Sequence, residues 1–167
     1  MGNGFAPKFF SDWTISPILE IGSGRPFNII TGNDDNLQLS SLTGRPNTFV
    51  NPACSAAPFG NAPVASKYSP TGVFQEPCLA DFNGSLLSLD GNLGRNAGVQ
   101  PWVVFGDMRF AKRIYFGERF NTELIADMFN LANKYNVAAV SPLFTNAGQA
   151  TAAFDPRQFQ FALKLYW

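Results

Sequence analysis

The residue types that most often carry out catalysis are poorly combined in this chain of 167 residues. Histidine is absent, which removes the commonest general base and the commonest metal ligand. Serine and aspartate are frequent, but a nucleophilic serine needs a basic partner to take its proton. Asp34 and Asp35 stand among Asn and Gly residues, where carboxylates usually support turns. We therefore expect that the protein is not an enzyme and has no catalytic, cofactor-binding or metal-binding residues.

Cys54 and Cys78 are the only cysteines, and both lie in a segment rich in turn-forming residues. In an oxidising compartment such as the cell surface, two cysteines in one loop favour a disulfide, with Cα atoms about 4.4–6.8 Å apart. Two free buried thiols are the alternative. The spacing resembles no zinc site, and two thiols without histidine would bind zinc poorly.

The overall composition excludes several functional classes. The formal net charge is +0, so the basic footprint of a nucleic-acid-binding protein is missing and we expect no nucleic acid partner. Mean hydropathy is −0.03 and no apolar run is long enough for a transmembrane helix, which needs about 20 residues. Aromatic residues make up 14% of the chain, with 17 Phe. A membrane-spanning β-barrel remains compatible, because its strands alternate apolar and polar residues.

The C-terminal stretch 157–167 has the clearest pattern in the chain. Its odd positions carry apolar side chains, whereas its even positions are mostly polar. The apolar set is Phe159, Phe161, Leu163, Leu165 and Trp167. A strict period of two predicts a strand with one apolar and one polar face. Its length suits a tilted strand that crosses a hydrocarbon layer, which needs about 9–11 residues. The alternative is a terminal strand packed on a soluble core.

Four further segments show the same alternation. We predict strands at about 10–21, 26–31, 102–115, 120–130 and, as above, 157–167. Short turns at 22–26 and 116–120 alternate with long loops at about 32–101 and 131–156. Counted back from a periplasmic C-terminus, both short turns fall inside and both long loops outside, as in outer-membrane barrels. A disordered linker between two small domains is the alternative for 32–101.

Charge pairing predicts one register for the 102–130 hairpin. With Phe116 opposite Phe120, the polar face sets Arg113 against Glu123 and Arg109 against Asp127. A slip of two residues would lose both pairs, and a slip of one would turn charges toward lipid. We therefore expect these four residues to form charge pairs facing the lumen.

Several motifs, in this order, carry a family resemblance. They are Ser23-Gly24-Arg25-Pro26-Phe27, Gly32-Asn33-Asp34-Asp35-Asn36, Gly44-Arg45-Pro46-Asn47, Leu93-Gly94-Arg95-Asn96, Phe129-Asn130-Leu131-Ala132-Asn133 and Arg157-Gln158-Phe159-Gln160-Phe161. From about residue 10, the chain resembles the C-terminal end of TonB-dependent receptors of the Oar-like group. These outer-membrane proteins often carry a carboxypeptidase-regulatory-like domain ahead of the barrel. The 157–167 strand corresponds to the signature strand that ends such barrels.

The resemblance implies an all-β fold: an antiparallel meander of about five transmembrane strands, part of a large outer-membrane β-barrel with long extracellular loops. The start Met1-Gly2-Asn3-Gly4 lacks the basic and apolar regions of a signal peptide. We therefore expect residues 1–167 to be the C-terminal fragment of a transporter or receptor in the cell outer membrane of a Gram-negative-type bacterium.

The partners implied by the resemblance are outer-membrane lipid, the remainder of the chain's own barrel and plug, and TonB acting through the missing N-terminal part. Two other functions stay open at this point. One is an outer-membrane adhesion or assembly protein without transport. The other is a soluble β-sandwich that binds carbohydrate, which predicts that a second sheet covers the apolar strand face.

Overall fold

A computed structural model describes residues 9–33, 44–57, 59–60, 73–78, 81 and 90–167. The chain divides into two compact units. The sheet unit comprises Met1–Gly22, Val103–Asn136 and Phe154–Trp167, and the loop unit comprises Ser23–Trp102 and Val137–Ala153. Asp34 and Asp35 lie outside the described residues.

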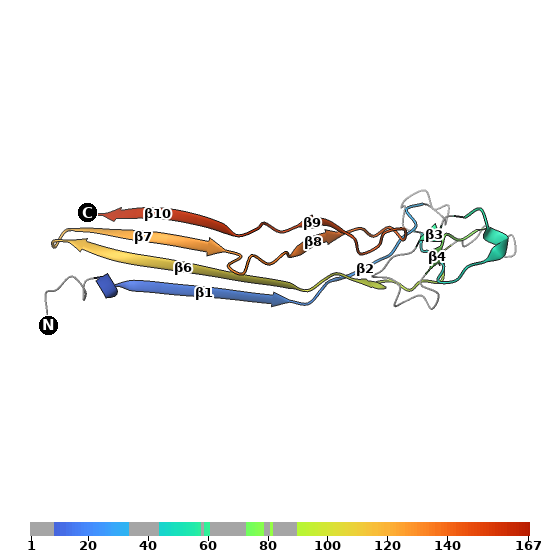
Figure 1. The fold of residues 1–167 in the computed structure, drawn as a ribbon, viewed down its shortest axis with the longest axis horizontal. Helices are drawn as coiled ribbons and strands as arrows, with labels where there is room; N and C mark the ends of the chain where they lie inside the picture. The colour runs from blue at the N-terminus through green and yellow to red at the C-terminus, as the bar shows by residue number, and fades with distance from the viewer. Residues whose placement is uncertain (1–8, 34–43, 58, 61–72, 79–80, 82–89) are drawn as a thin grey trace. The chain divides into compact units, whose positions relative to one another are not determined.

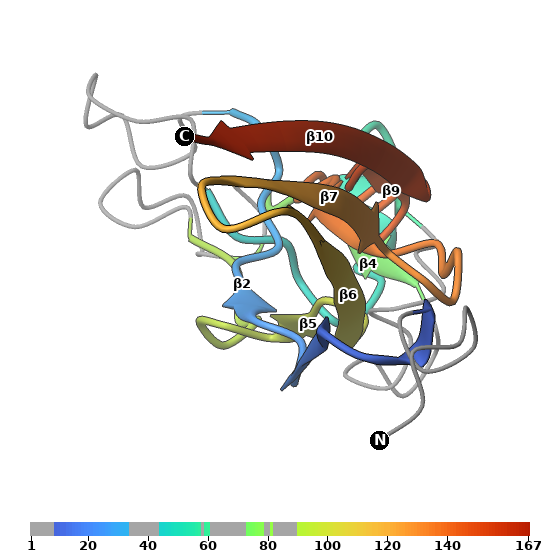
Figure 2. The same ribbon diagram turned by 90° about the vertical axis from the view of Figure 1, so that its left-hand side faces the viewer.

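The sheet unit contains four long strands. They are β1 (Trp13–Gly22), β6 (Val103–Phe116), β7 (Phe120–Phe129) and β10 (Gln158–Tyr166). They lie in the order β1-β6-β7-β10 and every neighbouring pair is antiparallel (Figure 1). Seen from the end, β7 lies between β6 and β10 (Figure 2). The fold is therefore all-β, as predicted, and β1 and β10 form the two edges of this sheet.

The predicted hairpin at 22–26 is wrong. Instead of folding back on 26–31, β1 pairs with β6, from Trp13 opposite Lys112 to Gly22 opposite Val103. Strand β6 offers ten consecutive partners, whereas 26–31 is short and begins with Pro26, which cannot donate to a ladder. Only Pro26–Phe27 (β2) is extended there, and it pairs with Gly98–Val99 (β5) in the loop unit.

This correction reduces the long strands from about five to four and reverses the assumed direction of β1. The single tight turn lies at 117–119, and both the start of β1 and the end of β10 lie at that turn end of the sheet. The segments 23–102 and 130–157 connect strands at the opposite, loop end. The predicted sorting of short and long connections therefore holds with one short turn instead of two.

The register of the β6–β7 hairpin is the predicted one. Arg113 pairs with Glu123, Arg109 with Asp127, and Phe116 with Phe120 across the turn. The residue with positive φ is Gly117, at 75°, and not Arg119 at the end of the turn. Glycine therefore takes the left-handed position at little steric cost, and Arg119 is free of backbone strain.

The apolar face of the sheet is uncovered, as expected for a surface in lipid. On β10, Phe161 is 78% exposed, and every other residue of the strand is exposed too. On β7, Phe120 and Leu124 are also exposed, whereas Met128 is half-buried between neighbouring strands. Among the described residues no second sheet covers this face, which contradicts the β-sandwich alternative.

The loop unit has a core of its own, drawn from both long connections. Its short elements are β2, η1 (Pro52–Cys54), β3 (Phe59–Gly60), β4 (Phe74–Gln75), β5, β8 (Val137–Val140) and β9 (Ala150–Ala153). The buried cluster consists of Ile29, Phe74, Leu93, Ala97, Phe144 and Ala147. A bridge between Ile30 and Leu143 joins the two connections. The described part of 32–101 is therefore packed structure and not a disordered linker.

Candidate functional site: a charged sheet face and a braced loop unit

The polar face of the sheet carries the predicted charge pairs. The Arg109 guanidinium donates from Nε to Asp127 Oδ1 at 2.6 Å and from Nη2 to Oδ2 at 2.8 Å. This two-point contact fixes both side chains more tightly than a single bond would. The side chain of Arg109 is 53% exposed, so the pair lies on an open wall and not inside a protein core.

Glu123 is the centre of a second group on the same face. Its Oε2 lies 4.0 Å from both Arg113 Nη2 and Lys164 Nζ, and it accepts a hydrogen bond of 3.0 Å from the Tyr166 hydroxyl. The Arg113 guanidinium lies 5.4 Å from the centre of the Tyr166 ring. The Glu123 carboxylate on β7 thus contacts a cationic side chain on β6 and both a cationic side chain and a hydroxyl on β10. Such a polar group suits a wall that faces water.

We expect a charge swap to test the Arg109–Asp127 contact. Reversing either residue alone, as Arg109→Asp or Asp127→Arg, places like charges opposite each other and lowers stability. The double variant restores opposite charges and is expected to recover part of the loss, measured by urea unfolding in lipid vesicles. The recovery should shrink in 1 M salt, where the Debye length is about 3 Å. Additive single effects would contradict the pairing.

The apolar face has one charged strand residue within the four described strands, Lys112. Its Nζ donates to the carbonyls of Phe9, at 3.1 Å, and Ser11, and lies 5.5 Å from the centre of the Trp13 ring. Only 8% of Lys112 is exposed. The segment before β1 therefore covers the ammonium group with backbone oxygens and an aromatic ring, which lowers the cost of a charge on this face.

Strand β10, predicted to be the signature strand that ends a barrel, lies at an edge of the sheet. Phe159, Leu163 and Leu165 are 54%, 59% and 57% exposed, and Trp167 is 88% exposed. Strand β10 has β7 as its partner on one side, and among the described residues no strand pairs with its other side. This edge can accept a further strand.

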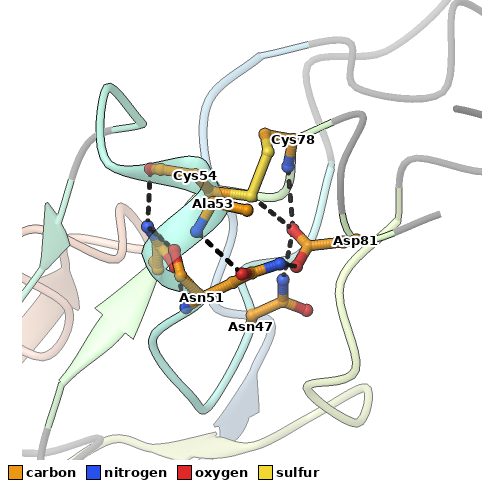
Figure 3. Close-up of a disulfide and its surroundings, with 7 residues drawn as sticks. Asn47, Asn51, Ala53, Cys54, Cys78 and Asp81 are labelled. Atoms are coloured by element: carbon orange, nitrogen blue, oxygen red, sulfur yellow. Dashed lines mark hydrogen bonds between the residues drawn. A yellow bond between two sulfur atoms is a disulfide. The ribbon is translucent and has the colours of Figure 1, made fainter. Parts of the chain in front are cut away.

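Cys54 and Cys78 form a disulfide with Cα atoms 5.7 Å apart, inside the expected range. The Asp81 carboxylate lies beside it and accepts hydrogen bonds from Cys78 N at 2.9 Å, Asn51 Nδ2 at 2.7 Å and Asn47 Nδ2 at 3.1 Å (Figure 3). Asp81 Oδ2 is also 3.2 Å from Cys54 Sγ, which has no proton to donate when oxidised. The two sulfurs and Asp81 meet within 4.8 Å, but the disulfide uses both sulfurs.

A second cluster of polar contacts in the loop unit is the hydrogen-bonded ion pair of Arg45 and Asp90. The Arg45 backbone N–H and its Nε donate to the Asp90 carboxylate at 2.9 and 2.7 Å, and its Nη2 forms a further close contact. Hydrogen bonding to Asp90 raises the pKa of Arg45. At Gly91 a Cβ atom would lie 2.3 Å from the Arg45 carbonyl oxygen, so only glycine fits this close approach. The contact explains the arginine of the Gly44-Arg45-Pro46-Asn47 motif and the glycine at position 91.

Sequence reasoning missed the role of three asparagines at the loop end of the sheet. Asn130 and Asn133 have positive φ, and Asn133 Oδ1 accepts a bond from Arg157 N at 3.1 Å. Asn136 is 1% exposed and exchanges two bonds with the backbone of Val104, at 3.0 and 2.6 Å. Asparagine at every third position directly after a strand was the available signal, because asparagine tolerates left-handed backbone and bonds to it locally.

We expect Asn136→Ala to loosen this end of the sheet. The substitution removes both bonds and leaves the N–H and C=O groups of the half-buried Val104 without these partners, which costs up to about 1–3 kcal/mol for each group that stays unsatisfied. Hydrogen exchange at the Val104 amide should become faster, by the factor that corresponds to the lost free energy. Asn146→Ala, a change in the loop unit, serves as the control. Unchanged protection of Val104 would contradict the role of Asn136.

The antiparallel sheet has one exposed apolar face and one charged face, with its short turn at one end and its long connections at the other. These features define a wall segment of a membrane-spanning β-barrel. The chain matches the outer membrane beta barrel domain family over residues 1–160, and it belongs to that family. No curated protein and no solved structure matches it significantly. Helices that are both long and apolar enough to cross a bilayer are absent from the described residues.

Proposed function

We propose that the chain is the C-terminal part of a TonB-dependent outer-membrane transporter or receptor of the Oar-like group. In this role the four strands form barrel wall, with the apolar face in lipid and the charged face toward the lumen. The loop unit forms the substrate-facing outer surface. A plug and TonB, which delivers energy from the inner membrane, would act through the N-terminal part of the same protein.

The observation that carries this proposal is the shared core of the loop unit. Ile29 and Leu93 come from the first long connection and Phe144 from the second, yet all three pack together. Both connections begin and end in strands of the sheet unit, and together they build one folded structure with a common core. Folded loops of this kind fit a role in substrate binding better than a role as simple connections between strands.

The sheet also requires more strands than the described residues contain. Single-chain bacterial barrels have at least 8 strands, and here β1 and β10 each have one neighbour. Lipid tolerates no unpaired backbone edge. We infer that the remainder of a large barrel pairs with both edges, which agrees with the resemblance to receptors whose lumen holds a plug.

The coding sequence upstream of Met1 tests the transporter directly. A frame that continues into further alternating strands, a plug domain and a TonB-binding segment is the expected result. Deletion of that plug should abolish energy-dependent uptake while leaving the barrel in the outer membrane. An upstream frame without a plug would overturn transport and favour the adhesion or assembly protein.

A further inference from the structure

A pocket of about 430 Å³ lies on the polar face of the sheet unit, at its loop end. It is lined by Phe105, Asp107, Phe129, Asn130, Phe154, Asp155, Pro156, Gln158 and Gln160. The lining residues of β6, β7 and β10 share the face that carries the Arg109–Asp127 pair. In the proposed transporter this pocket opens into the lumen.

Three phenyl rings gather in this pocket, although the face is otherwise rich in charged and polar side chains. Phe105 and Phe154 meet edge to face with ring centres 5.0 Å apart and planes at 87°. Phe154 is 47% exposed and Phe129 is 40% exposed. Rings on the polar face are not stabilised by burial in lipid. Contact with a ligand explains why they are exposed there.

The two ionisable lining residues, Asp107 and Asp155, are both acidic. Asp107 Oδ1 accepts a bond of 2.9 Å from Asn130 N, and Asn130 Nδ2 donates to the Asp155 carbonyl at 3.2 Å. Asn130 is 5% exposed and thus ties both acidic residues to one buried residue, Asp107 through its backbone N–H and Asp155 through its side-chain amide. Arg157, although adjacent in sequence, is not part of the lining, and Arg109 is paired with Asp127.

We propose that this pocket binds an ammonium or guanidinium group of the substrate. Aromatic ring faces attract cations, and quaternary ammonium ligands are typically held by several rings together. Carboxylates add charge-assisted contacts, and the amides of Gln158 and Gln160 can orient polar parts of the ligand. The negative lining disfavours an anionic ligand. This assignment rests on the proposed transporter, for which it names the substrate class.

The test uses the protein in detergent micelles and calorimetric titration with choline. Its neutral isostere, 3,3-dimethylbutan-1-ol, has the same shape without the charge. We expect choline to bind about tenfold more tightly or better, with affinity falling as salt rises. Asp155→Asn and Phe129→Leu should each weaken choline binding several-fold. Glu118→Gln, which removes an exposed carboxylate from the turn at the other end of the sheet, should leave it unchanged.

Equal affinity for choline and its isostere, or no binding of either, would overturn the assignment. Binding of a neutral saccharide such as maltose without choline would overturn it too and point to a sugar site. Because binding is measured directly, these failures differ from loss of the proposed function, which the plug deletion and energy-dependent uptake test separately.

Discussion

Replacing Phe161 by arginine is expected to lower the free energy of unfolding in lipid vesicles by about 2–4 kcal/mol, the cost of an arginine near the bilayer midplane on a barrel's lipid face. Phe161 lies near the middle of β10 and is 78% exposed, so the substitution disturbs little packing within the sheet. The loss therefore reports transfer of the guanidinium into hydrocarbon.

The neighbouring position provides a matched control. Ala162 is also exposed and lies one residue further along β10, on the opposite face. Ala162→Arg should cost far less, because the charge stays in water in the lumen. Phe161→Ala corrects for loss of the ring. A larger loss for Ala162→Arg than for Phe161→Arg, in equilibrium unfolding with urea, would assign the two faces the other way round.

Removal of the disulfide is expected to destabilise the loop unit by about 3 kcal/mol. The disulfide stabilises the folded loop because it lowers the conformational entropy of the unfolded chain. The cysteines are 24 residues apart in the sequence, and Cys54 is 3% exposed. In Cys54→Ala/Cys78→Ala the Asp81 carboxylate keeps its bonds to Asn47 and Asn51 only while the loop stays folded. The loss should therefore appear as cooperative local opening.

Hydrogen exchange at the Asn47 and Gln75 amides measures this opening, since these residues pair their backbones at 2.8 and 3.1 Å. Their protection should fall by roughly the factor that corresponds to the lost free energy, and reduction of the wild-type disulfide should have a similar effect. Protection of Leu124 in the sheet unit should stay the same. Unchanged exchange at Gln75 would show that the disulfide does not hold the loop unit together.

The four long strands, and the register between β6 and β7, followed from local pattern, because period two and opposite charges act between neighbours. Arg113 opposite Glu123 needed only the hairpin connection between them. The partner of β1 could not be found in this way. Its true partner, β6, begins 81 residues after Gly22, the difference between positions 103 and 22, and the nearer segment at 26–31 offered a plausible alternation.

The loop unit shows a second limit of local pattern. Ile29 and Thr31 alternate as in a strand, yet they are buried with side chains from distant segments, such as Phe144 beside Ile29. No periodicity in the sequence predicts such a core, because each contact joins residues of separate loops. The polar-face pocket was missed for the same reason: Phe105, Phe129 and Phe154 come from three separate segments and meet only in the folded sheet unit.

Spin labels along β10 test the central claim most directly. Single cysteines introduced at 158–166, with the native disulfide intact, can be labelled in the protein reconstituted into lipid vesicles. Accessibility to oxygen, which concentrates in lipid, should peak at 159, 161, 163 and 165. Accessibility to a water-soluble nickel chelate should peak at 158, 160, 162, 164 and 166. Loss of this alternation, or the opposite phase, would contradict a strand with its apolar face in the membrane.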